Sequence, residues 1–332
     1  MRAFMNVVIA LAIVGCGKKS TETSAGSGSA KPAETKPADT GSANEATGGS
    51  GGNVAGGGGG TAAPVDAAVL KRGEYLANVL GCNSCHFAMT DKGPDFSRPY
   101  AGGLAVPEKY GTWHGPNITQ DKATGIGSWT DEQIGDAIRT GITPSGGQLY
   151  PIMPYLKYNR LTDDDTKALV AFLRTVKPIE NVVPKNDLKM PKPPATKPTN
   201  APDPADALGH GEYLVTIMHC AMCHSAKDKP FAGGAEFDLP FLGTGTLYGA
   251  NLTSDPETGI GKWSIDDIKK SISTLTRPDG TIIQGPMQLY LAGWTKLEDK
   301  DLTAIATYIK SIPPQANKVP ASTFKPNAPP AK

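Results

Sequence analysis

Two short segments of the sequence contain side chains that together can bind an iron porphyrin. Both follow the pattern Cys-x-x-Cys-His, and their residues are Cys82, Cys85, His86, Cys220, Cys223 and His224. This pattern is the attachment signature of c-type haem. The two sulfurs add to the vinyl groups of the porphyrin as thioethers, and the histidine that follows lies beneath the ring as the proximal ligand of the iron. The sequence therefore predicts two covalently bound haem c groups.

Two other kinds of site also use paired cysteines. A thioredoxin-like redox pair requires a βαβ context, which is not visible in this sequence. A structural zinc site requires four ligands at spacings of its own. Neither explains why a histidine directly follows the second cysteine in both segments, so we prefer haem attachment.

The one cysteine outside these two motifs, Cys16, ends an apolar N-terminal run. The run is too short to span a membrane and is typical of a secretory signal peptide, residues 1–15. Its end, Val14-Gly15-Cys16, resembles the bacterial lipobox and predicts lipidation of Cys16, which would hold the protein on a membrane surface. The alternative is an ordinary signal peptide, or an uncleaved anchor, with an incidental cysteine. We expect the periplasmic side of a bacterial envelope, and Gly17 in place of aspartate favours the outer membrane over the inner.

The rest of the chain divides at an internal repeat and at changes of composition. GEYLANVLGCNSCH matches GEYLVTIMHCAMCH 138 residues later, and two further pairs of segments match at offsets of 134 and 136 residues. Two copies are too few for a solenoid and indicate two tandem globular domains. The expected boundaries are 16–65 for a disordered low-complexity tether, 66–178 for domain 1, 179–206 for a proline-rich linker, 207–315 for domain 2 and 316–332 for a Pro/Ala-rich tail.

The elements that must position the haem motifs are expected to be helices joined by glycine-rich loops, so the fold class is all-α. Apolar residues at helical spacing lead into the first motif. Thr130 with Gln133 forms a predicted capping box, and Ser264 with Asp267 forms the matching N-terminal cap in domain 2. A last helix opens at Thr162 in domain 1, and its counterpart in domain 2 starts near Glu298. No run alternates as a convincing strand.

A haem bound by one histidine has an open face, and the residue that fills it separates electron transfer from chemistry on a substrate. That residue must come from a remote part of the chain, where methionine and histidine are the candidates. The methionines placed too close to the motifs, or in the linker, are Met89, Met218, Met222 and Met190. Met153 and Met287 remain, each in a Gly/Pro-rich loop before the last helix of its domain.

Other assignments stay open. Either methionine could simply fill the core, which is its usual fate. His114, His210 and His219 are each expected on the surface or in loops, and His114 is the one realistic histidine rival in domain 1.

Both domains resemble class I cytochrome c domains of the kind found in cytochrome subunits of membrane-associated alcohol, aldehyde and nicotinate-type dehydrogenases. The resemblance rests on GPNIT…TGIGSWT, LYPIMPYLKY and LTDDDTKALVAFLR in domain 1, and on GANLT…TGIGKW and LEDKDLTAIATYIKS in domain 2. It implies that His86 and His224 are proximal ligands and that Met153 and Met287 are distal ligands. Domain 2 departs from the family's Met-Pro pattern, because Gln288 follows Met287.

The leading functional hypothesis is a dihaem carrier, tethered to a membrane by lipid, that accepts electrons from one redox protein and passes them to another. A periplasmic dehydrogenase is a candidate partner. The formal net charge of +1 gives no electrostatic case for nucleic acid. The rival hypotheses are a dihaem enzyme of the peroxidase or thiosulfate-oxidising type, and a haem sensor, each with an open or displaceable distal site in domain 2.

Overall fold

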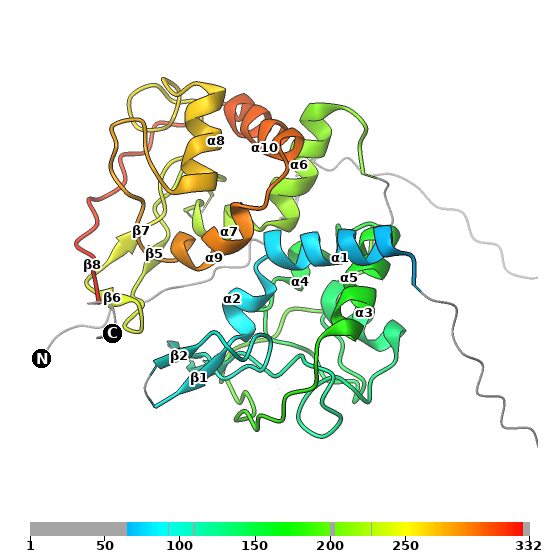
Figure 1. Cartoon of the computed structure of the whole chain (residues 1–332). Coiled ribbons are helices and arrows are strands. Elements are labelled where there is room, and N and C mark those ends of the chain that lie inside the picture. Colours follow the sequence, from blue (N-terminus) through cyan, green and yellow to red (C-terminus); the bar gives the residue numbers. More distant parts are fainter. Residues whose placement is uncertain (1–64, 92, 109, 200–202, 227, 328–332) are drawn as a thin grey trace, which may run out of the picture. The chain divides into compact units, whose positions relative to one another are not determined.

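The computed structural model describes residues 65–91, 93–108, 110–199, 203–226 and 228–327. The signal peptide, the tether up to residue 64 and the lipidation site Cys16 therefore lie outside the described residues. Figure 1 shows helices and short strands, in two successive sets of similar order.

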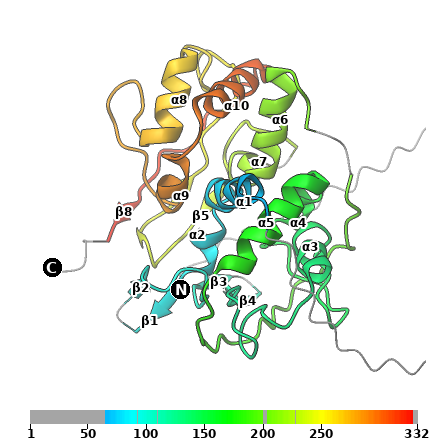
Figure 2. The same ribbon diagram turned by 45° about the vertical axis from the view of Figure 1, so that its right-hand side comes forward.

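Domain 1 is built around two long helices, of which the first leads into the haem motif and the second ends the domain. Its elements are α1 (Ala67–Val79), α2 (Cys82–His86), β1 (Ala88–Thr90), β2 (Gly93–Asp95), β3 (Ala105–Glu108), β4 (Gly111–His114), α3 (Asp131–Arg139), α4 (Tyr155–Tyr158) and α5 (Asp163–Thr175). Helices α1 and α5 pack against each other (Figures 1 and 2). A Cβ on Gly73 would lie 1.9 Å from the carbonyl oxygen of Ala168, so this crossing requires glycine.

Domain 2 repeats this arrangement with shorter strands. Its elements are α6 (Ala207–Ile217), α7 (Cys220–Cys223), β5 (Glu236–Phe237), β6 (Gly243–Thr244), β7 (Leu247–Tyr248), α8 (Ile265–Thr274), α9 (Met287–Trp294), α10 (Asp299–Ser311) and β8 (Lys325–Pro326). Helix α6 packs on α10, and Gly211 occupies the close approach that Gly73 occupies in domain 1. The all-α fold class is confirmed, because the strands among the described residues form only two-stranded antiparallel pairs.

The caps predicted from the sequence are present. Thr130 and Gln133 form a full capping box at α3, and Thr162 caps α5. Ser264 and Asp267 form a full box at α8 as well. Each box satisfies N–H groups that have no partner within the helix.

The proline-rich linker lies across domain 1. Leu188 is buried in a cluster with Phe87, Leu104 and Trp113. The Asn181 side chain donates to the carbonyl oxygens of Ala101 and Gly102. The equivalent Asn317 does the same in domain 2, and the segment after it pairs as β8 with β6. A strap therefore follows the last helix of each domain and covers the loop beyond the haem motif.

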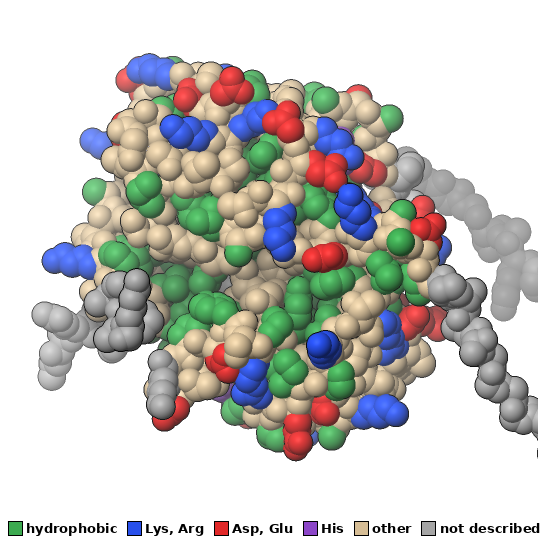
Figure 3. All heavy atoms as spheres, viewed as in Figure 1, with side chains coloured by type: hydrophobic (Ala, Val, Ile, Leu, Met, Phe, Trp, Pro, Cys, Tyr) green, Lys and Arg blue, Asp and Glu red, His purple; other side chains and the backbone are tan. Residues whose placement is uncertain are grey.

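The two domains share one hydrophobic core cluster and pack through α1 and α9. The indole Nε1 of Trp294 in domain 2 donates to the carbonyl oxygen of Val79 in domain 1 at 3.1 Å. Among the described residues, no helix combines the length and the apolar character needed to cross a membrane. On the face in Figure 3, Lys and Arg side chains are interspersed with Asp and Glu.

Candidate haem sites

Each Cys-x-x-Cys-His motif forms one short helical turn directly after a long helix. Gly81, at φ +71°, reverses the chain between α1 and α2, and His219 does so at φ +48° between α6 and α7. Glycine adopts this left-handed backbone without strain, whereas histidine does so at a cost. All four cysteines of the motifs are partly buried. The turn brings both sulfurs and the histidine of each motif together.

Both motif histidines are held in the same way by a backbone carbonyl. Nδ1 of His86 lies 2.7 Å from the Pro116 oxygen, and Nδ1 of His224 lies 2.9 Å from the Ala250 oxygen. A carbonyl only accepts, so Nδ1 carries the proton and Nε2 keeps its lone pair. Burial lowers the pKa of both imidazoles, against a smaller opposing effect of the carbonyl, and so favours the neutral form that binds metal.

A buried polar network fixes the loop that supplies this carbonyl. In domain 1 the side-chain oxygen of Asn117 accepts from the N–H and the hydroxyl of Thr119, at 2.9 and 2.8 Å. Its amide donates to Thr124 and to the carbonyl oxygen of Ile179 in the strap. Asn251 makes the same four kinds of contact in domain 2. The repeated N-I/L-T…T-G-I-G motif therefore orients the proximal histidine through its loop.

The glycine that precedes this loop allows it to approach the motif. A Cβ on Gly115 would lie 2.0 Å from the carbonyl oxygen of Cys85, and one on Gly249 would lie 1.8 Å from that of Cys223. Both distances are far inside van der Waals contact, so a side chain at either position would push the loop away from the histidine.

The structure places Met153 in a turn before α4, and Met287 as the first residue of α9. The expectation that both lie in loops is thus wrong for Met287. Both side chains are partly buried and pack against the hydrophobic core cluster that Cys82 and Cys220 also contact. A thioether is a soft donor that suits haem iron. The assignment of both methionines as ligands stays a prediction.

The other histidines have different surroundings. His114 lies in β4, where its backbone exchanges two hydrogen bonds with the Asn186 side chain. His210 lies in helix α6 and not in a loop, and its half-buried side chain is between two carboxylates. His219 packs edge-on against Tyr158 of domain 1 and Tyr290 of domain 2, and burial lowers its pKa to about 4.

The thiols do not have the character of a reactive redox pair. Burial raises the pKa of Cys82 and Cys220 to about 12 and that of Cys85 and Cys223 to about 11. Redox-active cysteines have lowered pKa values. Within the part of the chain that the structure describes, no three His, Cys, Asp or Glu side chains are grouped to hold a metal ion. Paired thiols beside a neutral histidine fit haem attachment instead.

Comparison with known proteins decides the family. The cytochrome c family model matches the chain twice, over residues 70–177 and 210–313. The chain belongs to the cytochrome c family. Its two cytochrome c domains each bind one haem c covalently, which confirms the two haem groups expected from the sequence.

The relatives include cytochrome subunits of dehydrogenases. The chain is 34% identical over 277 residues to the fructose dehydrogenase cytochrome subunit of Gluconobacter japonicus, which covers 77% of this chain and 55% of the relative. It is 34% identical to the alcohol dehydrogenase (quinone) cytochrome c subunit of Gluconacetobacter polyoxogenes, covering 75% and 57%. A diheme cytochrome c-type of Cereibacter sphaeroides is 31% identical, covering 73% and 85%. The chain thus spans about half the length of the dehydrogenase relatives.

Proposed function

We propose that this protein is a lipid-tethered dihaem cytochrome c that carries electrons between redox proteins on the periplasmic side of a bacterial envelope. The observation that supports this most directly is the pair of equivalent hydrogen bonds at His86 and His224. In both domains the histidine that follows the two cysteines donates from Nδ1 to a backbone carbonyl. Its Nε2 is therefore left to bind iron. A chain with two such sites can accept an electron at one and release it at the other.

The residues of each domain have distinct roles in this proposal. Cys82 and Cys85, and Cys220 and Cys223, hold the porphyrins as thioethers. His86 and His224 bind the irons from the proximal side, and Met153 and Met287 bind them from the distal side. The bound haem supplies one-electron redox chemistry. The chain buries the group, keeps each imidazole neutral and in one tautomer, and sets the potential through its ligands and hydrogen bonds.

The donor is proposed to be a dehydrogenase, because several relatives are named as dehydrogenase cytochrome subunits. Attachment to the membrane rests on Cys16, whose lipobox-like context is a sequence prediction. We expect Cys16→Ala to release the protein from the membrane fraction and to abolish labelling with radioactive palmitate. Labelling that persists in Cys16→Ala would contradict lipidation at this residue.

The axial ligands are tested by absorption spectroscopy of the full-length oxidised protein. We expect a weak methionine–iron charge-transfer band that falls by about half in Met153→Ala and by about half in Met287→Ala, since each domain holds one haem. Met190→Ala, which changes a partly buried methionine of the linker, is the matched control and should keep the whole band. High-spin haem in the unmodified protein would contradict the carrier and favour an enzyme or a sensor.

A further inference from the structure

Two tyrosine–aspartate hydrogen bonds join the domains reciprocally. The Tyr75 hydroxyl in α1 donates to Asp301 in α10 at 2.5 Å, and the Tyr213 hydroxyl in α6 donates to Asp165 in α5 at 2.7 Å. The tyrosines are 138 residues apart and the aspartates 136, so both pairs use equivalent positions of the repeat. Each domain therefore donates one tyrosine hydrogen bond to the other domain and accepts one from it.

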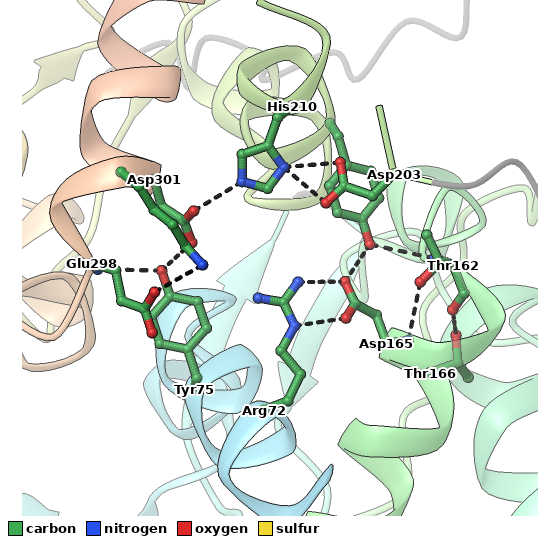
Figure 4. A network of polar contacts seen from close by, with 11 residues as sticks. Arg72, Tyr75, Thr162, Asp165, Thr166, Asp203, His210, Glu298 and Asp301 are labelled. Carbon is green, nitrogen blue, oxygen red and sulfur yellow. Dashed lines mark hydrogen bonds and ion pairs between the residues drawn. The ribbon is translucent and has the colours of Figure 1, made fainter. Parts of the chain in front are cut away.

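Each aspartate is also held by a basic side chain of its own domain (Figure 4). Arg72 contacts both oxygens of Asp165 at 2.7 Å, and Nε2 of His210 lies 2.8 Å from Asp301. Arg72 and His210 are again equivalent positions. Asp203, which precedes α6, contacts the other ring nitrogen of His210. We call these residues the Tyr–Asp clamp: Arg72, Tyr75, Asp165, Asp203, His210, Tyr213 and Asp301.

The clamp is buried at the carboxylates. Asp165 is 7% exposed and Asp301 is fully buried. A buried carboxylate must be compensated by charge and by hydrogen bonds. Burial, together with the neighbouring aspartate, raises the pKa of Tyr75 and Tyr213, so both hydroxyls stay protonated and keep donating. If the domains separated, each aspartate would lose a donor from the other domain.

Two of the helices that carry the clamp, α1 and α6, lead directly into the haem motifs. Helix α1 ends three residues before Cys82, and α6 ends three residues before Cys220. Holding α1 against α10 and α6 against α5 therefore fixes the relation between the two attachment turns. The ring of Tyr290 in α9 lies at this junction, where a Cβ on Gly81 would be 2.3 Å from it.

We infer that Tyr75 and Tyr213 are positioning residues for electron exchange between the two haems, because their bonds to Asp301 and Asp165 hold the two haem-bearing domains in one fixed relation. This inference rests on the proposed carrier function. The exchange moves one electron from the reduced haem to the oxidised haem and requires no other reactant. Its rate depends on the separation and orientation of the two groups, which the clamp sets.

The test uses the full-length holoprotein with Tyr75→Phe, Tyr213→Phe and both together. The rate of exchange is measured in half-reduced protein from the paramagnetically shifted haem-methyl NMR signals, at several protein concentrations to isolate the intramolecular part. A hydrogen bond to a charged group favours the docked state by roughly tenfold to a hundredfold, and the double variant loses two. We expect slower exchange in the double variant, with each single variant between it and the parent protein.

A second readout does not depend on electron transfer. Backbone amides of α1 and α9, which meet at the junction, should exchange hydrogen faster in the double variant, whereas those of α3 and α8 should not change. Tyr308→Phe is the matched control, because its ring packs on Phe231 within domain 2. The absorption spectrum and the midpoint potential of each haem should stay at parent values in all variants.

The outcomes separate the two proposals. Parent rates and parent amide exchange in the double variant would overturn the positioning role and leave the carrier function standing. Altered spectra or potentials with an unaltered exchange rate would also overturn it, because the tyrosines would then act on the haem sites themselves. A parent protein whose haems cannot be reduced or cannot exchange electrons would refute the carrier function before any variant is compared. If the double variant lacks haem, the two single variants decide.

Discussion

Replacing Asn117 with alanine should both weaken domain 1 and change its haem. The side chain is 4% exposed and makes four hydrogen bonds, at 2.8 to 2.9 Å, to Thr119, Thr124 and Ile179. These bonds fix the loop that begins at Pro116, whose carbonyl oxygen accepts the hydrogen bond from Nδ1 of His86. One truncation therefore removes the internal support of the loop that orients the proximal histidine.

The magnitude follows from the number of bonds. Each hydrogen bond contributes about 0.5 to 1.5 kcal/mol net, so four contribute about 4 kcal/mol to the free energy of unfolding. That is a large part of the roughly 5 to 15 kcal/mol by which a domain is stable. The substitution affects the haem through the basicity of the His86 imidazole. A hydrogen bond at Nδ1 makes the imidazole a stronger donor, which favours oxidised iron, so weakening the bond should raise the midpoint potential.

The assay is urea denaturation followed by circular dichroism, with a redox titration of the same samples. Asn251→Ala is the internal counterpart, because Asn251 is 3% exposed and makes the same contacts in domain 2. Asn117→Ala should move only one of the two midpoint potentials, and Asn251→Ala only the other. The control is Asn327→Ala, an exposed asparagine, which should change stability by less than about 0.5 kcal/mol.

Two results would refute this reasoning. If Asn117→Ala lowered the free energy of unfolding by less than about 1 kcal/mol, the four hydrogen bonds together would contribute no more than one ordinary hydrogen bond. If the potential stayed constant while stability fell, the loop would support the fold without orienting His86.

Three further predictions concern single contacts. Gly249→Ala places a Cβ 1.8 Å from the Cys223 oxygen, so haem content measured as pyridine haemochrome should fall by half. Gly135→Ala, whose Cβ would meet the Thr166 methyl at an ordinary contact distance of 3.4 Å, should keep the haem content. Trp294→Phe removes the buried bond to Val79 and should lower the free energy of unfolding, measured in urea, by about 1 to 3 kcal/mol. Burial would lower the pKa of His210, but Asp203 and Asp301 outweigh it and raise it. Its stabilisation is therefore complete below about pH 6.5 and is lost as pH rises through the raised value, and His210→Arg should remove that dependence in pH-dependent urea unfolding.

These single-contact predictions can each fail clearly. Full haem loading in Gly249→Ala would mean that the loop yields without disturbing the attachment turn. A Trp294→Phe variant as stable as the parent would show that the hydrogen bond from the indole nitrogen to Val79 contributes nothing to stability in solution. Identical pH profiles for the parent and His210→Arg would show that His210 does not titrate between its carboxylates.

The sequence was sufficient to predict the haem chemistry because that chemistry is local. Two thiols and an imidazole within one turn need no distant residue to be recognised, and a capping box such as Thr130 with Gln133 is read within four residues. Amphipathic helices and the repeat likewise indicated two all-α domains. The short strand pairs were missed, since segments of two to four residues carry too little alternation to be detected.

The partners that orient the haem ligands could not be predicted, because they are backbone atoms or distant side chains. Pro116 and Ala250 contribute carbonyl oxygens, which no side-chain pattern marks. Tyr75 and Asp301 are 226 positions apart, and nothing in either segment alone indicates the other. His210 was expected on the surface or in a loop, and its carboxylate partner Asp301 is 91 positions away. The repeat did contain a usable signal, since tyrosine and aspartate recur at matching positions in both copies.

The reciprocity of the clamp has a physical consequence for the chain. A surface that donates a tyrosine hydrogen bond and accepts one at the equivalent position is complementary to a second copy of itself. This is the property of an isologous two-fold interface. Two copies of one module therefore pair through the same residues, and joining them in one chain turns that pairing into an intramolecular event at high effective concentration. The two halves of the clamp differ in their basic residue, because Arg72 and His210 occupy equivalent positions, and His210 also contacts Asp203. Since arginine stays charged and histidine does not, only the domain 2 half of the interface responds to pH in the neutral range.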